Sequence, residues 1–449
     1  MNHLKTLNMT EGRPGKLLLA FTIPMLIGNI FQQLYSMVDS IVVGQYVGSN
    51  ALAAVGATGS INFFFFSFSF GLAAGIGVVV SQYFGARNDK QVMKTIANSI
   101  YVLSTISIVM SILGILLARI ILVAMNTPII ILENSILYMR VTCAGIIAVS
   151  AYNGVSSILR ALGDSKTPLL FLVVASFINI ALDLLFVISF NWGVFGVAIA
   201  TIISQTVAAI GCIIYAYQKI AYFRIPKEFY EVDRELVIKC IKIGIPVSFQ
   251  NSLIAVSCIA LQSVVNSFGE TVVAAFTASG RFEQLIQQPF NSLGAAVVTY
   301  TGQNIGAGKV DRVKKGFWAA TIMCAIFSLI MLPVAYFGSS GIMRMFVSDL
   351  EVIQMGARAI RITAFFYFTL GMIYVSRAVL NGAGDAAYAM INGLVEITGR
   401  VGLARPLTMI PAIGYWGVWY TTGLTWLITG TISCIRYAGG KWKTKTIIN

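Results

Sequence analysis

The chain has 449 residues, of which 57% are hydrophobic and only 11% are charged, and its mean hydropathy is +0.82. These values lie outside the range of soluble domains and predict an integral membrane protein. The net charge of +14 does not indicate nucleic acid binding, because the basic residues gather in the short connections between apolar segments. The sequence contains no phosphate-binding P-loop, which argues against an ATP-driven pump.

Twelve apolar segments follow one another, each about 20 residues or longer and therefore able to cross the hydrocarbon as a helix. They are continuously apolar, which excludes the alternating strands of a membrane β-barrel. The expected fold is an all-α membrane protein with twelve transmembrane helices. These lie at about 17–43, 53–83, 95–118, 134–158, 168–190, 194–217, 241–266, 274–302, 316–337, 353–379, 386–410 and 414–435.

The sequence is duplicated. Leu159–Asp164 reads LRALGD and returns 221 residues later as LNGAGD at Leu380–Asp385, and the same offset relates Gln82 to Gln303. Six helices per repeat place both repeats in the membrane in the same orientation, with their pseudo-two-fold axis along the membrane normal. We therefore predict two parallel six-helix lobes with a cleft between them, as is typical of transporters.

The lobes are predicted as an N-lobe at 1–218, a cytoplasmic link at 219–239 and a C-lobe at 240–449. With twelve spans, nearly all basic clusters fall on one side of the membrane, although Arg344 is an exception. The positive-inside rule then places both termini in the cytoplasm of a multi-pass protein of the cell inner or plasma membrane. The clusters are Lys5, Arg13 and Lys16; Arg87, Lys90 and Lys94; Arg160 and Lys166; the link; Lys309 to Lys315; and Arg436 to Lys445.

Two carboxylates lie inside predicted spans without a basic residue on the same helix. Asp39 is in the first span and Asp183 in the fifth, and Asn179 lies on the same helix face four residues before Asp183. An uncompensated charge at membrane depth is costly, so each carboxylate must be protonated, bind a cation or meet an arginine of another helix. Both fall in the outer halves of their spans, where they could share one cavity.

Three further polar residues of the N-lobe could add oxygen atoms to this cavity: Tyr138, Asn153 and Thr201. The alternative is that they only bond to neighbouring groups and hold helices together. An all-oxygen set around Asp39 and Asp183 suits a proton network or a hard monovalent cation such as Na⁺. The only histidine is His3 and the six cysteines are scattered as small core residues, so we expect no other metal and no cofactor.

This cluster has no counterpart in the second repeat, where Asp183 corresponds to Ala404 and Asn179 to Arg400. Glu396 and Arg400 are spaced for an ion pair within one helix. Glu283 is a further intramembrane carboxylate, and its orientation is open. The duplication therefore covers the architecture but not this chemistry.

Pro24 and Pro246 occupy equivalent places in the first and seventh spans, where each removes a backbone hydrogen bond and can bend its helix. A static kink is the alternative. Aromatic and amide side chains of the second and eighth spans could contact a flat organic cation in the cleft, although most of the phenylalanines are expected to pack. The cleft candidates are Gln33, Phe63, Phe66, Glu283, Gln284 and Gln287.

The residues resemble the multidrug and toxic compound extrusion (MATE) family over essentially the whole chain. The resemblance rests on Ile23-Pro24, the segment Leu34–Ser40, the turn Arg160–Asp164 and the pair Asn179 and Asp183, which look like the prokaryotic DinF-like branch. It implies twelve helices in two lobes and export of amphipathic, often cationic compounds in exchange for H⁺ or Na⁺. It also implies that the N-lobe cluster carries the coupling. The NorM-like branch has acidic groups in its seventh and tenth helices, and this chain has none there.

We accordingly expect a secondary active antiporter that works by alternating access. We expect it to act as a monomer in the lipid bilayer, with a small amphipathic substrate and no nucleic acid partner. One alternative is a flippase or exporter of a lipid-linked or other amphipathic metabolite from the same superfamily. A passive channel needs no carboxylate that changes charge. An enzyme would need a nucleophile or metal set that the sequence lacks.

Overall fold

The computed structural model describes residues 7–448, so His3 and Lys5 lie outside the described residues. Within 7–448 the chain forms α-helices joined by short 3-10 and π-helical turns, and no strand occurs there. The chain divides into two compact units. Unit 1 contains Ile23–Phe249 and short pieces of both chain ends, and unit 2 contains Thr10–Thr22 and Gln250–Thr446.

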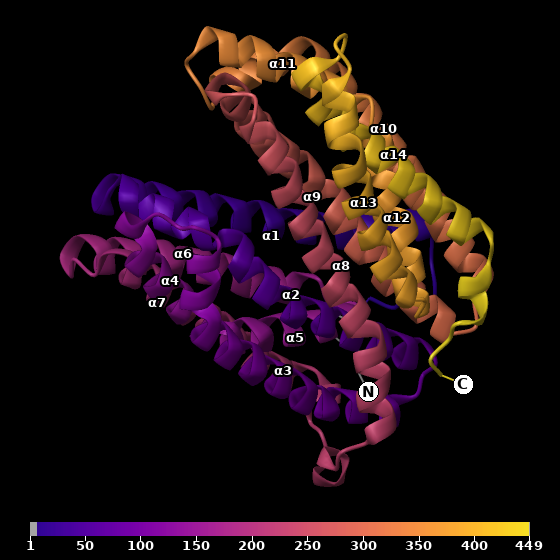
Figure 1. Ribbon diagram of the computed structural model, residues 1–449. Helices are drawn as coiled ribbons and strands as arrows, with labels where there is room; N and C mark the ends of the chain where they lie inside the picture. Colours follow the sequence, from indigo (N-terminus) through magenta and orange to yellow (C-terminus); the bar gives the residue numbers. More distant parts are fainter. Residues whose placement is uncertain (1–6, 449) are drawn as a thin grey trace. The chain divides into compact units, whose positions relative to one another are not determined.

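Unit 1 is a bundle in which α2 is the central helix. It packs against α3, α4 and α5, and α7 packs against α4, α5 and α6 (Figure 1). Phe65 of α2 is 3% exposed and contacts a core formed with α3, α4 and α5. The helices are α1 (Pro14–Val42), α2 (Ser49–Gly85), α3 (Asp89–Ala124), α4 (Ile129–Ala144), α5 (Ile146–Ala161), α6 (Lys166–Leu184) and α7 (Gly193–Lys219).

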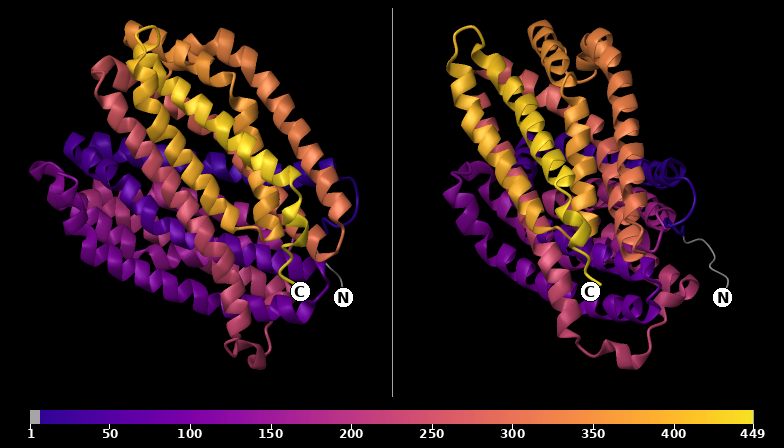
Figure 2. Two further views of the ribbon diagram at one scale, coloured as in Figure 1. Left: turned by 45° about the vertical axis from the view of Figure 1, so that its right-hand side comes forward. Right: turned by 90° about the vertical axis from the view of Figure 1, so that its right-hand side faces the viewer.

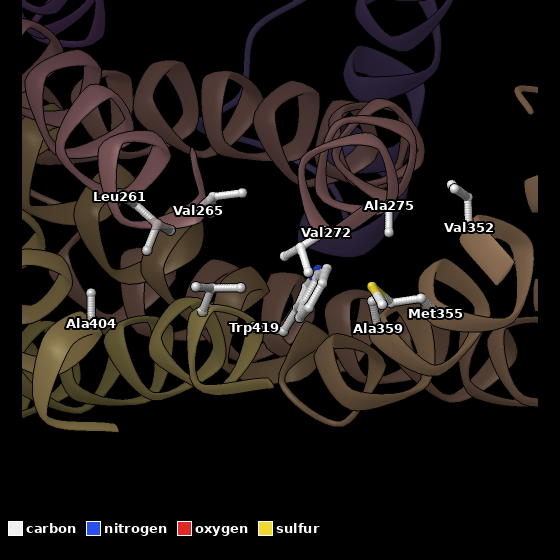
Figure 3. Close-up of a cluster of buried hydrophobic side chains, with 10 residues drawn as sticks. Leu261, Val265, Val272, Ala275, Val352, Met355, Ala359, Ala404 and Trp419 are labelled. Carbon is white, nitrogen blue, oxygen red and sulfur yellow. The ribbon is translucent and has the colours of Figure 1, made fainter. Parts of the chain in front are cut away.

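Unit 2 repeats this arrangement around α9, which packs against α10, α11 and α12. One part of its core surrounds Trp419 of α14, with Val272 of α9 and Ala359 of α11 beside it (Figure 3). The Trp419 indole N–H donates to Ser279 Oγ at 3.2 Å, so this buried ring has its polar atom satisfied. The helices are α8 (Arg234–Asn266), α9 (Glu270–Gly306), α10 (Val310–Arg344), α11 (Leu350–Ala364), α12 (Tyr367–Ala383), α13 (Ala387–Met409) and α14 (Gly417–Ala438).

Both unit boundaries fall inside helices. The chain passes from unit 2 to unit 1 after Thr22, within α1, and from unit 1 to unit 2 after Phe249, within α8. The predicted lobes 1–218 and 240–449 have different bounds, because the first part of α1 belongs with the second repeat and the first part of α8 with the first. The bends predicted at Pro24 and Pro246 would lie within three residues of these two crossings.

Twelve helical elements result when two broken helices are each counted once. The predicted spans 134–158 and 353–379 are bent pairs, α4 with α5 at 43° and α11 with α12 at 50°. Within 7–448, seven helices are long and apolar enough to span a membrane, and up to nine if each bent pair is one span. The other three, α9, α13 and α14, have 37, 23 and 22 residues and are long enough, but their sequences are more polar.

The duplicated turn has a structural reason. Gly163 and Gly384 both have positive φ, at +92° and +94°, which an L-residue with a Cβ rarely adopts. After each glycine an aspartate N–H bonds back to the carbonyl five residues earlier, Asp164 to Leu159 at 2.8 Å and Asp385 to Leu380 at 2.9 Å. This is the Schellman arrangement that closes a helix. The repeated letters Gly-Asp therefore end α5 and α12 in the same way.

The connection between α7 and α8 is shorter than the predicted link, because α7 runs to Lys219 and α8 begins at Arg234. It is also held in place (Figure 2). Asn98 of α3 donates to Glu231 O at 3.3 Å and accepts from Asp233 N at 2.8 Å. Tyr101 of α3 donates to Tyr230 O at 2.7 Å. The connection is thus a docked part of unit 1.

Candidate functional site

The two N-lobe carboxylates occupy equivalent positions at the ends of two helices. Asp39 is in the last turn of α1 and Asp183 in the last turn of α6, and each helix continues as a π-helical turn, Val43–Val47 and Leu185–Ser189. The two π turns contact each other. Single π turns within helices are rare and occur often at functional sites. The backbone therefore departs from α geometry directly after both carboxylates.

The carboxyl groups of Asp39 and Asp183 approach each other within hydrogen-bonding range. Asp183 is fully buried, and neither of its oxygens has another partner; Oδ1 of Asp39 is also buried without one. Two ionised carboxylates can only accept, so this contact becomes a hydrogen bond only when one of them holds a proton. In the described part of the chain neither forms an ion pair with a lysine or arginine. Of the three alternatives, an arginine from another helix is therefore not the one that balances them in the described residues.

A polar crevice of unit 1 lies beside this pair. It is lined by Tyr35 of α1, Asn179 of α6 and Thr201 and Gln205 of α7, and it is too narrow to admit a water molecule. Asn179 is 2% exposed, and both atoms of its side-chain amide lack a partner. Thr201 Oγ1 donates within its own helix, to Val197 O at 3.1 Å. The crevice therefore offers unused oxygen and amide groups next to the carboxylates.

The structure places the other two predicted residues differently. Tyr138 of α4 packs on an apolar cluster that includes Val42 and Val187, and its ring lies near both aspartates. Asn153 of α5 donates to Val149 O at 2.7 Å, within its own helix. Tyr138 thus belongs to the surroundings of the site, whereas Asn153 shows the helix-internal bonding that was the alternative for it.

Two residues were missed as site members. Tyr35 lies one helical turn before Asp39, and its hydroxyl is within hydrogen-bonding range of Gln32 and Gln205. Its spacing of four residues from Asp39 was a usable signal, because it puts both side chains on one face of α1. Gln205 carries no comparable signal, since its closeness to Tyr35 depends on how α7 packs against α1.

The sequence pattern of the MatE family matches residues 24–185 and 246–399. Over 98% of both chains the sequence is 31% identical to the probable multidrug resistance protein YpnP of Bacillus subtilis. It is 26% identical to the probable multidrug resistance protein YoeA of the same organism, over 89% of this chain and 88% of that protein. The chain belongs to the MatE family.

A solved structure, a MOP superfamily transporter from Pyrococcus furiosus, superimposes with a TM-score of 0.92 at 23% identity, covering 98% of this chain and 100% of that one. The fold is therefore shared with this transporter, in agreement with the fold that the resemblance to the MATE family implied. MatE proteins are multi-pass membrane transporters and not enzymes, so this chain is a membrane transporter with a small-molecule substrate. The family pattern includes Asp39, Asn179 and Asp183 and thus spans the site just described.

The predicted cleft residues of unit 1 differ in exposure. Gln33 of α1 is half-buried. Phe63 of α2 is 40% exposed, and its ring centroid lies 6.5 Å from that of Phe70. Phe66 packs against the apolar core next to Phe65. Phe63 is therefore the phenylalanine of this set that is open to a ligand.

In unit 2 the predicted cleft residues lie on α9. Gln284 is exposed, and Gln287 accepts from Tyr374 OH at 3.3 Å. Glu283 faces inward, with a buried Oε1 that has no partner, and lies close to Thr363 and Tyr367. Its side chain is half-buried, and its role in a substrate cleft stays a prediction.

The predicted pair within α13 is confirmed: Glu396 and Arg400 are 3.7 Å apart and both are buried. Arg400 Nη1 also donates to Ser257 Oγ of α8 at 3.0 Å and lies 2.6 Å from Cys258 Sγ. Cys258 is exposed, so the expectation that every cysteine is a core residue is wrong for this one. Arg400 thus ties α13 to α8.

Within 7–448 no group of three or more His, Cys, Asp or Glu side chains could hold a metal ion. The carboxylate pair with Asn179 and Thr201 is an oxygen and amide set. Such a set fits a proton or a small monovalent ion as a transported co-substrate.

Proposed function

We propose that this transporter exports amphipathic, often cationic organic compounds in exchange for protons, with Asp39 and Asp183 as the coupling groups. The observation that carries this proposal is the contact between two carboxyl groups that have no basic partner in the described part of the chain. A negative charge of this kind is stable in a membrane protein only when something mobile balances it. A proton and a cationic substrate can both do so.

Competition between protons and a cationic substrate for this negative charge would couple their transport in opposite directions. When the pair faces the cytoplasm and is ionised, its negative charge favours binding of a cationic compound. When it faces outward, a proton shared by Asp39 and Asp183 removes that charge and weakens the hold on the compound. Because linkage is reciprocal, bound cation must lower the affinity for protons by the same factor.

The proton is the favoured coupling ion because the crevice next to the pair has no room for a hydrated ion. A proton needs only the contact between the two carboxyl groups. Sodium could replace it only if Asn179, Asp183 and Thr201 moved apart to surround it, with oxygen distances of about 2.3–2.5 Å typical of hard cations of this size.

The substrate class rests on the multidrug resistance for which the two Bacillus subtilis relatives are named, and on the chemistry of unit 1. An exposed aromatic ring such as Phe63 can contact an apolar cation by cation-π interaction. Together these favour a lipophilic organic cation over a lipid-linked sugar.

The test uses the full chain in liposomes that hold tetraphenylphosphonium at the same concentration inside and outside. An inward-directed proton gradient should drive release of the probe against its own gradient, with one measurement following the probe and another the internal pH. Asp39→Asn and Asp183→Asn should each lower gradient-driven release at least tenfold. Glu133→Gln is the matched control, because Glu133 is an exposed carboxylate of the same unit that already pairs with Arg119.

Four results would contradict the proposal. Wild-type rates in both Asn variants would remove the coupling role of the pair. Release driven by a sodium gradient but not by a proton gradient would show that Na⁺, and not H⁺, is the coupling ion. Release that only follows the probe's own gradient would identify a passive channel, and proton flux without probe release would point to the flippase alternative.

A further inference from the structure

A second charged feature of unit 1 is not used by the coupling site. A small cavity of about 40 Å³ lies where α1, α5 and the start of α6 meet. Its polar wall contains the Arg160 guanidinium, Asn29 and Ser165, and Pro24 forms part of the α1 side. All these residues belong to unit 1.

The Arg160 guanidinium has no hydrogen-bond or ion-pair partner in residues 7–448. The titratable groups nearest to it are Tyr152 and Cys212, which carry no charge near neutral pH. Asp164 is close in sequence, but its carboxylate is occupied by the N–H groups of Lys166 and Thr167 at 3.0 Å each. The guanidinium is therefore a cation without a counterion.

An arginine that is half-buried in the wall of a membrane bundle normally meets a carboxylate, a backbone carbonyl or an anion from outside the protein. Guanidinium groups bind phosphate especially well, because their planar array of N–H donors matches two phosphate oxygens. We propose that Arg160 and this cavity bind the phosphate group of an anionic phospholipid.

The apolar part of the cavity favours a lipid over free phosphate. Met25 of α1 and Leu169 and Leu172 of α6 line it next to the polar groups, and neighbouring Leu170 is 57% exposed. A phosphate with attached glycerol and acyl chains can cover both surfaces, whereas inorganic phosphate leaves the apolar one in water. Arg160 also lies in a basic cluster on the side assigned to the cytoplasm, where basic pockets between helices bind anionic headgroups.

The second repeat has no such site. Asn381 occupies the position equivalent to Arg160, so the charge is absent there. We therefore expect one headgroup site per chain. Its headgroup would contact α1 at Pro24, two residues after the point where that helix passes from unit 2 to unit 1.

The test is binding of dioleoyl phosphatidylglycerol to the purified full chain in detergent, followed by native mass spectrometry and thermal unfolding. Wild type should bind one lipid tightly and unfold at a higher temperature in its presence. Arg160→Gln should weaken that binding about tenfold, the loss expected for one charge-assisted hydrogen bond. Arg140→Gln is the matched control, an exposed arginine of α4 with one long bond to Ile115 O at 3.4 Å, and it should bind like wild type.

Two further ligands separate the sources of the anion. Dioleoylglycerol, which lacks the phosphate, should give no protection, and equal protection by it would overturn the proposal. Sodium phosphate at the same concentration should raise the unfolding temperature far less. An equal rise would show that the site binds free phosphate and not a lipid. Undiminished phosphatidylglycerol binding by Arg160→Gln would also overturn it.

If Arg160→Gln does not fold, wild type and Arg160→Lys decide the question. A photoreactive phosphatidylglycerol should label peptides of α5 and α6 around residues 160–172 in wild type. Arg160→Lys, which keeps the charge but not the two-pronged donor, should be labelled less. Labelling confined to other helices would contradict the site. Because the readout is lipid binding, its failure leaves the transport proposal unaffected, and the reverse also holds.

Discussion

Asp183 is a fully buried carboxylate whose oxygens meet only another carboxyl group. Such a group destabilises the fold whenever it is ionised, because desolvation is not repaid by a partner. The coupling site is therefore a place where function and stability oppose each other. Removing the carboxylate should weaken transport and strengthen the fold.

We expect Asp183→Asn to raise the unfolding temperature of the full chain at pH 8 by an amount equivalent to about 1–3 kcal/mol. The reason is that the amide cannot ionise, whereas at this pH wild type must either keep a proton or hold two facing negative charges. As pH rises from 6 to 9, wild type should lose stability, since the shared proton is lost, and the variant should lose less. Thermal unfolding in detergent across this range measures both.

Ser176→Ala provides the comparison for that experiment. Ser176 lines the same crevice but only donates within its helix, to Leu172 O at 2.8 Å. The unfolding temperature of Ser176→Ala should change with pH in the same way as that of wild type. A steeper pH dependence in Asp183→Asn than in wild type would show that the two carboxylates do not share a proton.

At the scale of helices, the close approach of α2 and the first part of α8 in unit 1 depends on glycine. A Cβ at Gly75 of α2 would lie 2.6 Å from Gly244 N and 2.8 Å from Cys240 O of α8. Small residues at such crossings let two backbones pack closely, which is a main source of helix association in membranes. The first part of α8 is thus held in unit 1 partly by a crossing at which Gly75 and Gly244 let the two backbones pack closely.

Gly75→Ala should therefore lower the unfolding temperature, by an amount equivalent to about 1–3 kcal/mol, because backbone atoms of α8 must move. Gly56→Ala lies on the same helix with open space around it and should be neutral or stabilise by up to about 1 kcal/mol through helix propensity. Comparing the two variants by thermal unfolding removes the intrinsic effect of adding a methyl group. Equal changes in unfolding temperature would show that α2 and α8 do not pack closely at Gly75.

The connection from α7 to α8 should depend on the hydrogen bonds of Asn98. Asn98 is 1% exposed and bonds to both Glu231 and Asp233. Asn98→Ala should release residues 220–233 and make them several times more sensitive to limited proteolysis, because two backbone groups lose their partner. Ser104→Ala, an exposed change on the same helix, should not. Unchanged cleavage in Asn98→Ala would mean that Tyr101 alone holds the connection.

Hydropathy and repeats predicted the helical class, the duplication and nearly every helix, because apolar runs of this length have few alternatives in a bilayer. They did not predict the breaks at Gly145 and at Phe365-Phe366, since a single glycine or a pair of phenylalanines is common inside helices. Asp39 and Asp183 stood out because a charge in a span needs a reason. Gln205 did not stand out in the sequence, because its closeness to Tyr35 depends on how α7 packs against α1.

At the scale of the whole chain, each compact unit contains residues of both repeats. Unit 1 includes residues up to Phe249, which lie beyond the connection, and unit 2 includes Thr10–Thr22 from the first repeat. The two units have thus exchanged parts of α1 and α8.

We expect the fragment 1–226 expressed alone to be degraded or aggregated, because it lacks the part of α8 that packs at Gly75. Co-expression with 227–449 should restore a folded, purifiable complex, since all contacts of both units are then present. Size-exclusion chromatography in detergent measures this. A well-folded isolated 1–226 would show that the α8 segment is dispensable for unit 1.

The topology prediction also concerns the whole chain. A cysteine introduced at Lys227 in the connection should react with a membrane-impermeant maleimide only after the cell membrane is opened, because the positive-inside count places it in the cytoplasm. A cysteine at the exposed Met345, after α10, should react in intact cells. Labelling at Lys227 in intact cells would reverse the assigned orientation.

Both described ends of the chain return to unit 1, where Leu7 N–H donates to Gly163 O at 3.3 Å and Ile447 N–H donates to Gln82 Oε1 at 3.0 Å. Along the chain, unit 2 is therefore bracketed by unit 1. Mechanical tension applied to the two ends would first load the bonds that hold these terminal segments. At the N-terminal end these include the bonds from Lys309 to Thr10 O and from Arg312 to Gly12 O, which lie between Leu7 and α1. A pulling experiment should accordingly record a small early extension at low force, before any helix pair is extracted from the membrane.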